Sequence, residues 1–178
     1  NAAARDLSRA LDGGEATAWG EIAELLTPIT KAWCTDVGVE VTSTAVQVFG
    51  GMGYIEESGV SQHYRDMRIA PIYEGTNGIQ AMDLVGRMLG LRMGGVVNDL
   101  MTRMTATVAE LDAAGDEYAS IARNLADAVE TLSDATSWLM TSGLADPKEA
   151  LAGATPYLRI FGIVVGGWLM ARSAAVAA

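Results

Sequence analysis

The chain has 178 residues, half of them hydrophobic, with 12 basic and 22 acidic side chains and a formal net charge of −10. That length is sufficient for one domain or one and a half, with a sizeable core. One cysteine and one histidine exclude a disulfide framework and argue against a metal site, and the negative charge argues against a nucleic-acid partner. No signal or transit segment follows Asn1, so we expect a cytoplasmic protein, and both ends indicate a piece of a longer chain.

Helical patterns dominate the N-terminal part, and strand-like alternation is nearly absent. Residues 2–11 and 17–26 predict two short helices. Thr27 and Pro28 are typical of an N-cap and a first helical position, so a new helix is expected to begin there and to reach Phe49. The alternative is that the preceding helix continues past Pro28.

Glycine and hydroxyl residues set the next boundaries. Gly50-Gly51 ends the long helix, because glycine enters the left-handed cap without strain, and opens a loop to residue 57. Ser58 and Thr76 are candidate N-caps for helices to about Met67 and Leu89.

The C-terminal part also has helical periodicity. The expected elements are helices over 96–111 and 116–142, a connector over 143–155, and a last helix from about Tyr157. A glycine cluster at 90–95 is the best internal boundary. We therefore expect an all-α protein, a helical bundle with one unit over 1–91 and a second helical unit over 92–178.

Residues 47–90 contain most of the functional signal. Its three strings are Gln-Val-Phe-Gly-Gly-Met-Gly-Tyr from Gln47, Tyr-Arg-Asp-Met-Arg-Ile from Tyr64, and Ile-Tyr-Glu-Gly-Thr-Asn-Gly-Ile-Gln from Ile72. The first is a glycine turn where backbone can approach a ligand, or a plain helix cap. The third places Glu74, a candidate acid–base group or a solvated surface glutamate, ahead of a helix start. Free N–H groups at such a start suit an anion, although Thr76 could be a simple N-cap.

Together these strings resemble the C-terminal helical domain of flavin-dependent acyl-CoA dehydrogenases over about residues 25–90. Residues 27–33 and the long helical tail are most similar to the methylmercaptopropionyl-CoA dehydrogenase-like branch, which has a C-terminal extension. The resemblance implies oxidation of an acyl-CoA thioester to its trans-2-enoyl form, with FAD as hydride acceptor and electron-transfer flavoprotein as the next acceptor. It also implies a homodimer or homotetramer.

The resemblance also implies roles for individual residues. Glu74 matches the base that removes the α-proton, and its backbone N–H matches one donor to the thioester carbonyl. Tyr73 and Gly75 match residues that line the substrate site. Two groups match FAD contacts, the first to a neighbouring subunit's FAD and the second to the adenosine diphosphate portion: Gln47, Val48, Phe49, Gly50 and Gly51; Thr76, Asn77 and Gly78.

Two further expectations concern what surrounds these motifs. No β-domain is recognisable, so the isolated chain is expected to be inactive, and the alternative is a helical oligomerisation or peripheral membrane module. Only 12 uncharged residues separate Arg159 from Arg172, which is too few to span a bilayer. A buried core helix is therefore expected there rather than a membrane-facing one, with Gly162 and Gly166 permitting close helix packing. Arg65 and Asp66 are expected to form an ion pair.

Overall fold

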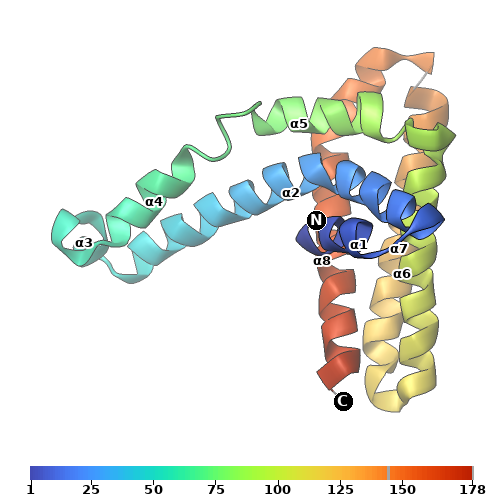
Figure 1. Cartoon of the computed structure of the whole chain (residues 1–178). Coiled ribbons are helices and arrows are strands. Elements are labelled where there is room, and N and C mark those ends of the chain that lie inside the picture. The colour runs from blue at the N-terminus through green and yellow to red at the C-terminus, as the bar shows by residue number, and fades with distance from the viewer. Residues whose placement is uncertain (144, 178) are drawn as a thin grey trace.

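A computed structural model describes residues 1–143 and 145–177, and every regular element in those ranges is helical (Figure 1). The α-helices are α1 (Ala2–Ala10), α2 (Gly13–Val48), α3 (Gly51–Tyr54), α4 (Val60–Arg68), α5 (Asn77–Asp83), α6 (Gly95–Ala114), α7 (Ala119–Trp138) and α8 (Pro147–Ala177). Short 3-10 or π-helical turns lie at Glu56–Ser58, Leu84–Met88, Leu91–Gly94, Asp116–Tyr118 and Leu139–Gly143. The all-α prediction is confirmed.

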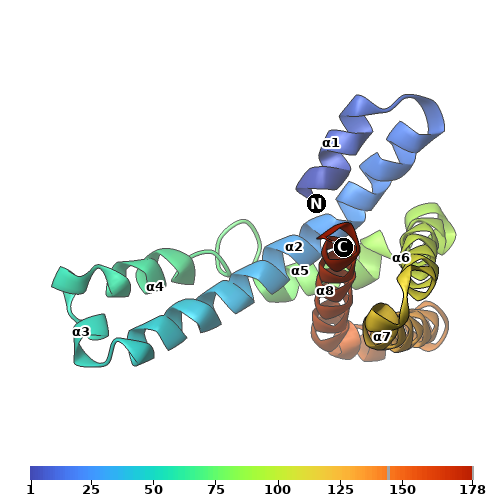
Figure 2. The ribbon, with the colours of Figure 1, turned by 90° about the horizontal axis from the view of Figure 1, so that it is seen from below.

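The molecule has two parts set at a wide angle. Helices α6, α7 and α8 lie side by side as a bundle, and α2 crosses it and continues outward (Figures 1 and 2). The outer half of α2 returns through α3 and α4 to the start of α5, and we call residues 33–76 the arm. The only buried residues of the arm are Gly53 and Ser61, so the arm is a two-helix layer with both faces open.

The bundle has the packed core. Its helices bury residues three or four positions apart, the spacing that places side chains on one helical face. The buried sets are Val96, Val97, Leu100, Met101, Met104, Thr107 and Leu111 on α6; Ala122, Leu125, Val129, Leu132 and Thr136 on α7; and Ala154, Tyr157, Leu158, Phe161, Val164, Trp168 and Ala171 on α8. The polar atoms are paired. The Trp168 indole N–H donates to Thr107 Oγ1 at 2.8 Å, and the Thr136 and Tyr157 hydroxyls lie 2.7 Å apart.

The helix expected to begin at Thr27 is instead the continuation of α2, so that prediction is wrong and its alternative is right. Pro28 lies inside α2 and is buried. The Thr27 hydroxyl donates to the Ala23 carbonyl at 2.8 Å, and the Asn1 amide donates to the same carbonyl at 2.9 Å. A proline inside a helix costs about 3 kcal/mol. The buried face from Ile22 to Ala32 offsets that cost through tertiary packing.

The connector expected over 143–155 is largely absent, because α8 already begins at Pro147. The Asp146 carboxylate accepts from the Lys148 N–H at 2.9 Å, so an Asp-Pro start was available in the sequence. Pro156 lies inside α8, on an exposed face. The predicted α6 and α7 are confirmed to within a few residues.

Smaller corrections concern the arm. Residues 51–54 form a single helical turn instead of a loop, and α4 begins at Val60 after a left-handed Gly59. Arg65 pairs with Glu56 at 2.8 Å and not with Asp66, since adjacent helical residues point in different directions.

Helix α8 joins the two parts. A Cβ at Gly162 would overlap the Trp33 ring, so this glycine permits the close approach of α2, whereas Gly166 faces open space. By length and composition, Pro147–Val176 is the one stretch in the described residues that could cross a membrane. The expectation that this segment is too short to span a bilayer is thus wrong by length and composition, whereas the expected core contact is present on one face of the helix.

Candidate functional site

The loop between α4 and α5 has the most unusual backbone in the arm. The Tyr73 N–H donates to the Ile69 carbonyl at 3.2 Å, which turns the chain. Glu74 and Gly75 then adopt left-handed conformations in succession, with φ of 53° and 86°. A left-handed conformation costs a non-glycine residue roughly 1–2 kcal/mol. Such a conformation persists only where the surroundings fix it, and it is common at functional sites.

Hydrogen bonds from two helices fix this loop. The Gln80 side chain on α5 donates to the Glu74 carbonyl at 3.2 Å. Lys31 on α2 donates to the Gly75 carbonyl at 2.6 Å. The Thr76 hydroxyl accepts from the Ile79 N–H at 3.4 Å, so Thr76 is the predicted N-cap of α5.

Asn77 fastens the end of the loop to α2. Its Oδ1 accepts from Lys31 at 2.8 Å. Its Nδ2 donates to the Ala32 carbonyl, to Thr35 Oγ1 and to Asp36 Oδ1, at 3.1, 2.9 and 2.7 Å. The Asn77 N–H donates to the Pro71 carbonyl at 3.2 Å. The polar groups of Asn77 thus already have partners within the chain, while Gly78 lies in the first helical turn, where amides have no intrahelical acceptor.

The second predicted group lies at the tip of the arm. Phe49 is the C-cap of α2, and Gly50 follows with φ of 59°, as expected for a glycine stop. Gln47 is exposed, and the side chains of Val48 and Phe49 are 78% and 56% exposed. No atom lies within 4 Å of a Cβ built on Gly50 or Gly51. The tip therefore presents open backbone and apolar side chains to a neighbouring surface.

The two predicted groups do not meet within one chain. Residues 73–78 form one continuous segment, the end of the loop and the first turn of α5, and it contacts α2 near Thr35. The twelve residues from Thr35 to Gln47 span about 18 Å along the helix. The candidate base and substrate residues thus share a site with the second cofactor group, and the first group is elsewhere.

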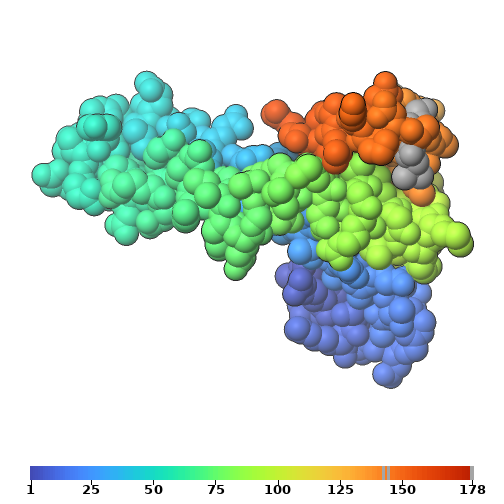
Figure 3. Space-filling model, turned by 90° about the horizontal axis from the view of Figure 1, so that it is seen from above, coloured from blue at the N-terminus to red at the C-terminus, as the bar shows by residue number. Residues whose placement is uncertain are grey.

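A cavity of about 310 Å³ adjoins the loop, between α2, α5 and α8. In Figure 3, α5 and the start of α8 lie next to each other beside the arm. The cavity wall includes Asn77 and Gly78, the carboxylates of Asp36 and Glu40, and the guanidinium of Arg159. Arg159 forms no ion pair within the described ranges.

The sequence analysis missed Lys31, Thr35 and Asp36 as supports of the loop. Lys31 and Thr35 are polar residues four positions apart, which places them on one face of the helix, and this spacing was the available signal. Their partners are more than 40 residues away along the chain. In the part of the chain that the structure describes, no cluster of three or more His, Cys, Asp or Glu side chains could hold a metal ion.

Comparisons with known proteins identify the family of the chain. Residues 2–90 match the family model described as "Acyl-CoA dehydrogenase, C-terminal domain", and residues 100–178 match one described as "Acetyl-CoA dehydrogenase C-terminal like". A 3-methylmercaptopropionyl-CoA dehydrogenase from Ruegeria pomeroyi is 45% identical over 88% of this chain and 26% of its own length. A butyryl-CoA dehydrogenase from Syntrophomonas wolfei is 29% identical over 98% and 28%.

One match is shorter and has a higher identity. A short-chain specific acyl-CoA dehydrogenase from Megasphaera elsdenii is 51% identical over 34% of this chain and 16% of its own length. The chain spans about a quarter of the length of the curated relatives that it matches most fully. Since one family model covers half of the chain and a second covers most of the remainder, the chain belongs to the acyl-CoA dehydrogenase family, whose members are FAD-dependent flavoproteins.

Proposed function

We propose that the chain is the C-terminal portion of a flavin-dependent acyl-CoA dehydrogenase, in which Glu74 removes the α-proton of an acyl-CoA thioester. The names of the relatives support this substrate class, since they include methylmercaptopropionyl-CoA and butyryl-CoA dehydrogenases. FAD, when bound, supplies the acceptor for the hydride that leaves the β-carbon. The product is a trans-2-enoyl thioester.

The observation that carries this proposal is the backbone of Glu74. Its carboxylate is exposed on a loop whose two left-handed residues are fixed by hydrogen bonds from α2 and α5. Left-handed non-glycine residues cluster at functional sites, and the other two in the described residues, Arg92 and Met93, lie outside the candidate loop. A carboxylate on a fixed backbone can meet an acidified α-carbon in a constant orientation. Exclusion of water by a bound acyl chain makes a carboxylate a stronger base.

The thioester carbonyl also needs a donor as enolate charge develops. The Glu74 N–H is suitable, because no backbone or side-chain acceptor in residues 1–143 or 145–177 takes its hydrogen. Tyr73 and Gly75 flank this amide and would line the thioester. One residue would thereby supply both the base and a carbonyl donor.

The predicted cofactor residues fit FAD in their chemistry. None of the eight has a charged side chain, so none of them opposes a diphosphate. Gly50 and Gly51 leave open space where a Cβ would stand. In the second group, the Thr76 hydroxyl and the Gly78 N–H would bind FAD. The side-chain amide and the N–H of Asn77 already form hydrogen bonds with α2 and with the Pro71 carbonyl.

The distance between the two groups is compatible with an assembly. If both bind FAD, groups about 18 Å apart along one helix would contact either different parts of one FAD or two FAD molecules. We propose a homodimer or homotetramer in which the tip of the arm, residues 47–51, meets the FAD of a neighbouring subunit. Electron-transfer flavoprotein is the proposed acceptor, and a cytoplasmic location stays a prediction.

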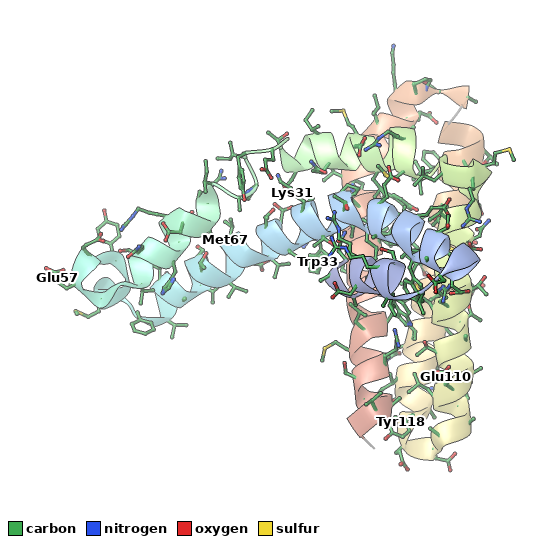
Figure 4. All side chains as sticks on the ribbon, in the orientation of Figure 1. Lys31, Trp33, Glu57, Met67, Glu110 and Tyr118 are labelled. Atoms are coloured by element: carbon green, nitrogen blue, oxygen red, sulfur yellow. The ribbon has the colours of Figure 1, made fainter. Side chains whose placement is uncertain are left out.

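The test is Glu74→Gln in the full-length protein that contains this chain. We expect acyl-CoA-dependent flavin reduction to slow by about 10²–10⁴-fold, the usual contribution of a general base. The readout is the loss of flavin absorbance after rapid anaerobic mixing with butyryl-CoA. Glu110→Gln makes the same change at an exposed position on α6, away from the loop, and should leave the rate unchanged (Figure 4).

Unchanged reduction in Glu74→Gln would remove Glu74 as the base. A full-length wild-type protein without acyl-CoA-dependent reduction would instead favour the alternative, an oligomerisation or peripheral membrane module. The observation that favours this alternative is the outer face of α8, where Ile163 and Met170 are exposed.

A further inference from the structure

Lys31 is one of two lysines in the chain, and its ammonium is turned to the candidate loop (Figure 4). Its Nζ lies 2.6 Å from the Gly75 carbonyl oxygen and 2.8 Å from Asn77 Oδ1. The side chain is half-buried, and none of the ion pairs in the described residues involves it. Its charge is thus directed at two uncharged oxygens of the loop, where hydrogen bonds from a charged donor are stronger than neutral ones.

The two peptide units around Gly75 are held from opposite sides. The carbonyl of Glu74 accepts from Gln80 on α5, and the carbonyl of Gly75 accepts from Lys31 on α2. Because Gly75 lacks a Cβ and has φ of 86°, its own backbone does little to restrict the loop. The hydrogen bonds from Lys31 and Gln80 therefore set the direction in which the Glu74 side chain points from the backbone.

Asn77 makes this support rigid. It accepts from Lys31 and donates to Asp36 and to the Ala32 carbonyl, so that the donor itself is held in place. Thr35 Oγ1 accepts from Asn77 Nδ2 at 2.9 Å and donates to the Lys31 carbonyl at 2.7 Å, which closes the network on α2. Lys31 therefore has little freedom to leave the loop.

We propose that Lys31 is a positioning residue for Glu74, which orients its carboxylate and N–H toward the thioester by holding the Gly75 carbonyl against α2. The inference rests on the proposed function of Glu74 as the base. The Lys31 ammonium bonds Gly75 and Asn77 and makes no hydrogen bond to Glu74, so it would act on the base through the backbone of the loop. Its loss should change the rate of proton removal more than the binding of substrate or flavin.

The experiment compares Lys31→Met with Lys31→Arg and Lys148→Met in the full-length flavoprotein. Met keeps the apolar stem without a donor, and Arg keeps a charged donor. Lys148→Met makes the same change at an exposed position near the start of α8. The main readout is deuterium incorporation at the α-carbon of butyryl-CoA in heavy water, followed by NMR. Flavin reduction, the KM and the FAD-to-protein ratio are measured in parallel.

We expect Lys31→Met to slow α-proton exchange and flavin reduction by roughly 10- to 100-fold, as small misplacements of a reacting group do. The KM should change by less than about threefold and the FAD content should stay constant, since ground-state binding is retained. Lys31→Arg should recover most of the rate, and Lys148→Met should match wild type. If Lys31→Met does not fold, Lys31→Gln keeps a neutral donor and should give an intermediate rate.

Wild-type exchange in Lys31→Met, or in Lys31→Gln where that variant replaces it, would overturn the inference. So would a slower rate that parallels loss of FAD and is not restored by arginine, because Lys31 would then be merely structural. Glu74→Gln separates the two proposals. If Glu74→Gln is inactive while Lys31→Met is fully active, only the positioning role of Lys31 fails. If Glu74→Gln is active, both the role of Glu74 as the base and the positioning role of Lys31 fail.

Discussion

The arm and the bundle are both helical, but they are stabilised differently. The bundle buries one face of each of its three helices and pairs its inner hydroxyl and indole groups. The arm, residues 33–76, buries only Gly53 and Ser61. It is held together by the packing of α4 on the outer half of α2 and by the hydrogen bonds of Asn77 to α2. Most of the proposed site residues are on the arm or directly after it. We therefore expect the bundle to supply most of the stability, while the arm holds the residues of the proposed site.

The two phenylalanines of the chain give the sharpest test of this difference, one in each part. Phe161 in the bundle is 0% exposed and Phe49 at the tip of the arm is 56% exposed. We expect Phe161→Ala to lower the free energy of unfolding by about 3–5 kcal/mol through lost burial and a cavity. Phe49→Ala should cost less than about 1 kcal/mol. Urea denaturation followed by circular dichroism measures both, and equal losses would contradict the comparison.

The junction between the two parts gives a smaller effect. Gly162→Ala introduces a methyl group where the Trp33 ring lies, so α2 and α8 must separate, at a cost of about 1–3 kcal/mol. Gly166→Ala, four residues further along α8, meets open space and should stabilise the helix by about 0.5–1 kcal/mol. Thermal melting compares the two variants. A neutral Gly162→Ala would show that the junction is loose.

The smallest effect depends on pH. Burial raises the pKa of Tyr157 far above its usual value, against a smaller lowering by the Thr136 hydroxyl. Its contribution is fully present below about pH 10, where tyrosine is neutral in the folded and unfolded states, and is lost as pH rises further, because only the unfolded chain ionises. Tyr157→Phe should therefore cost about 1 kcal/mol at pH 8 and flatten the decline above pH 10.

Tyr54 is the matched control in the arm, with 82% of its surface exposed. Tyr54→Phe should leave the decline of stability above pH 10 as in wild type, because folding does not bury this phenol. Unfolding midpoints in urea between pH 8 and 11 measure both variants. An unaltered pH profile in Tyr157→Phe would mean that its hydroxyl reaches solvent.

Local signals in the sequence predicted much of this architecture. Thr76 is the expected N-cap, Gly50 is the expected stop, and the long helices α6 and α7 were expected. These features depend on residues close together in the chain. Pro28 and Pro156 were misleading because tertiary packing stabilises a helix through a residue that ordinarily interrupts it.

The site was predicted in part for the same reason. The motif predicted Glu74 and its neighbours through family resemblance, but no local pattern predicts a left-handed glutamate held from two helices. The contacts of Lys31 with Gly75 and Asn77 span 44 and 46 residues, so only the folded chain brings them together. The ion pair of Arg65 likewise depended on Glu56, a partner in a different turn.

The continuity of α2 through Pro28 has a mechanical consequence. Its 36 residues form one continuous helix, which packs on the bundle with its N-terminal half and leads to residues 47–51 at its outer end. The part of α2 from Pro28 to Val48 is about 30 Å long, so a bend of about 5° at the proline would move the tip of the arm by roughly 2.6 Å. The loop with Glu74 is bonded to α2 at Lys31, close to Pro28, and would move several-fold less than the tip of the arm. The distance between the two candidate cofactor groups thus depends on how far α2 bends at Pro28.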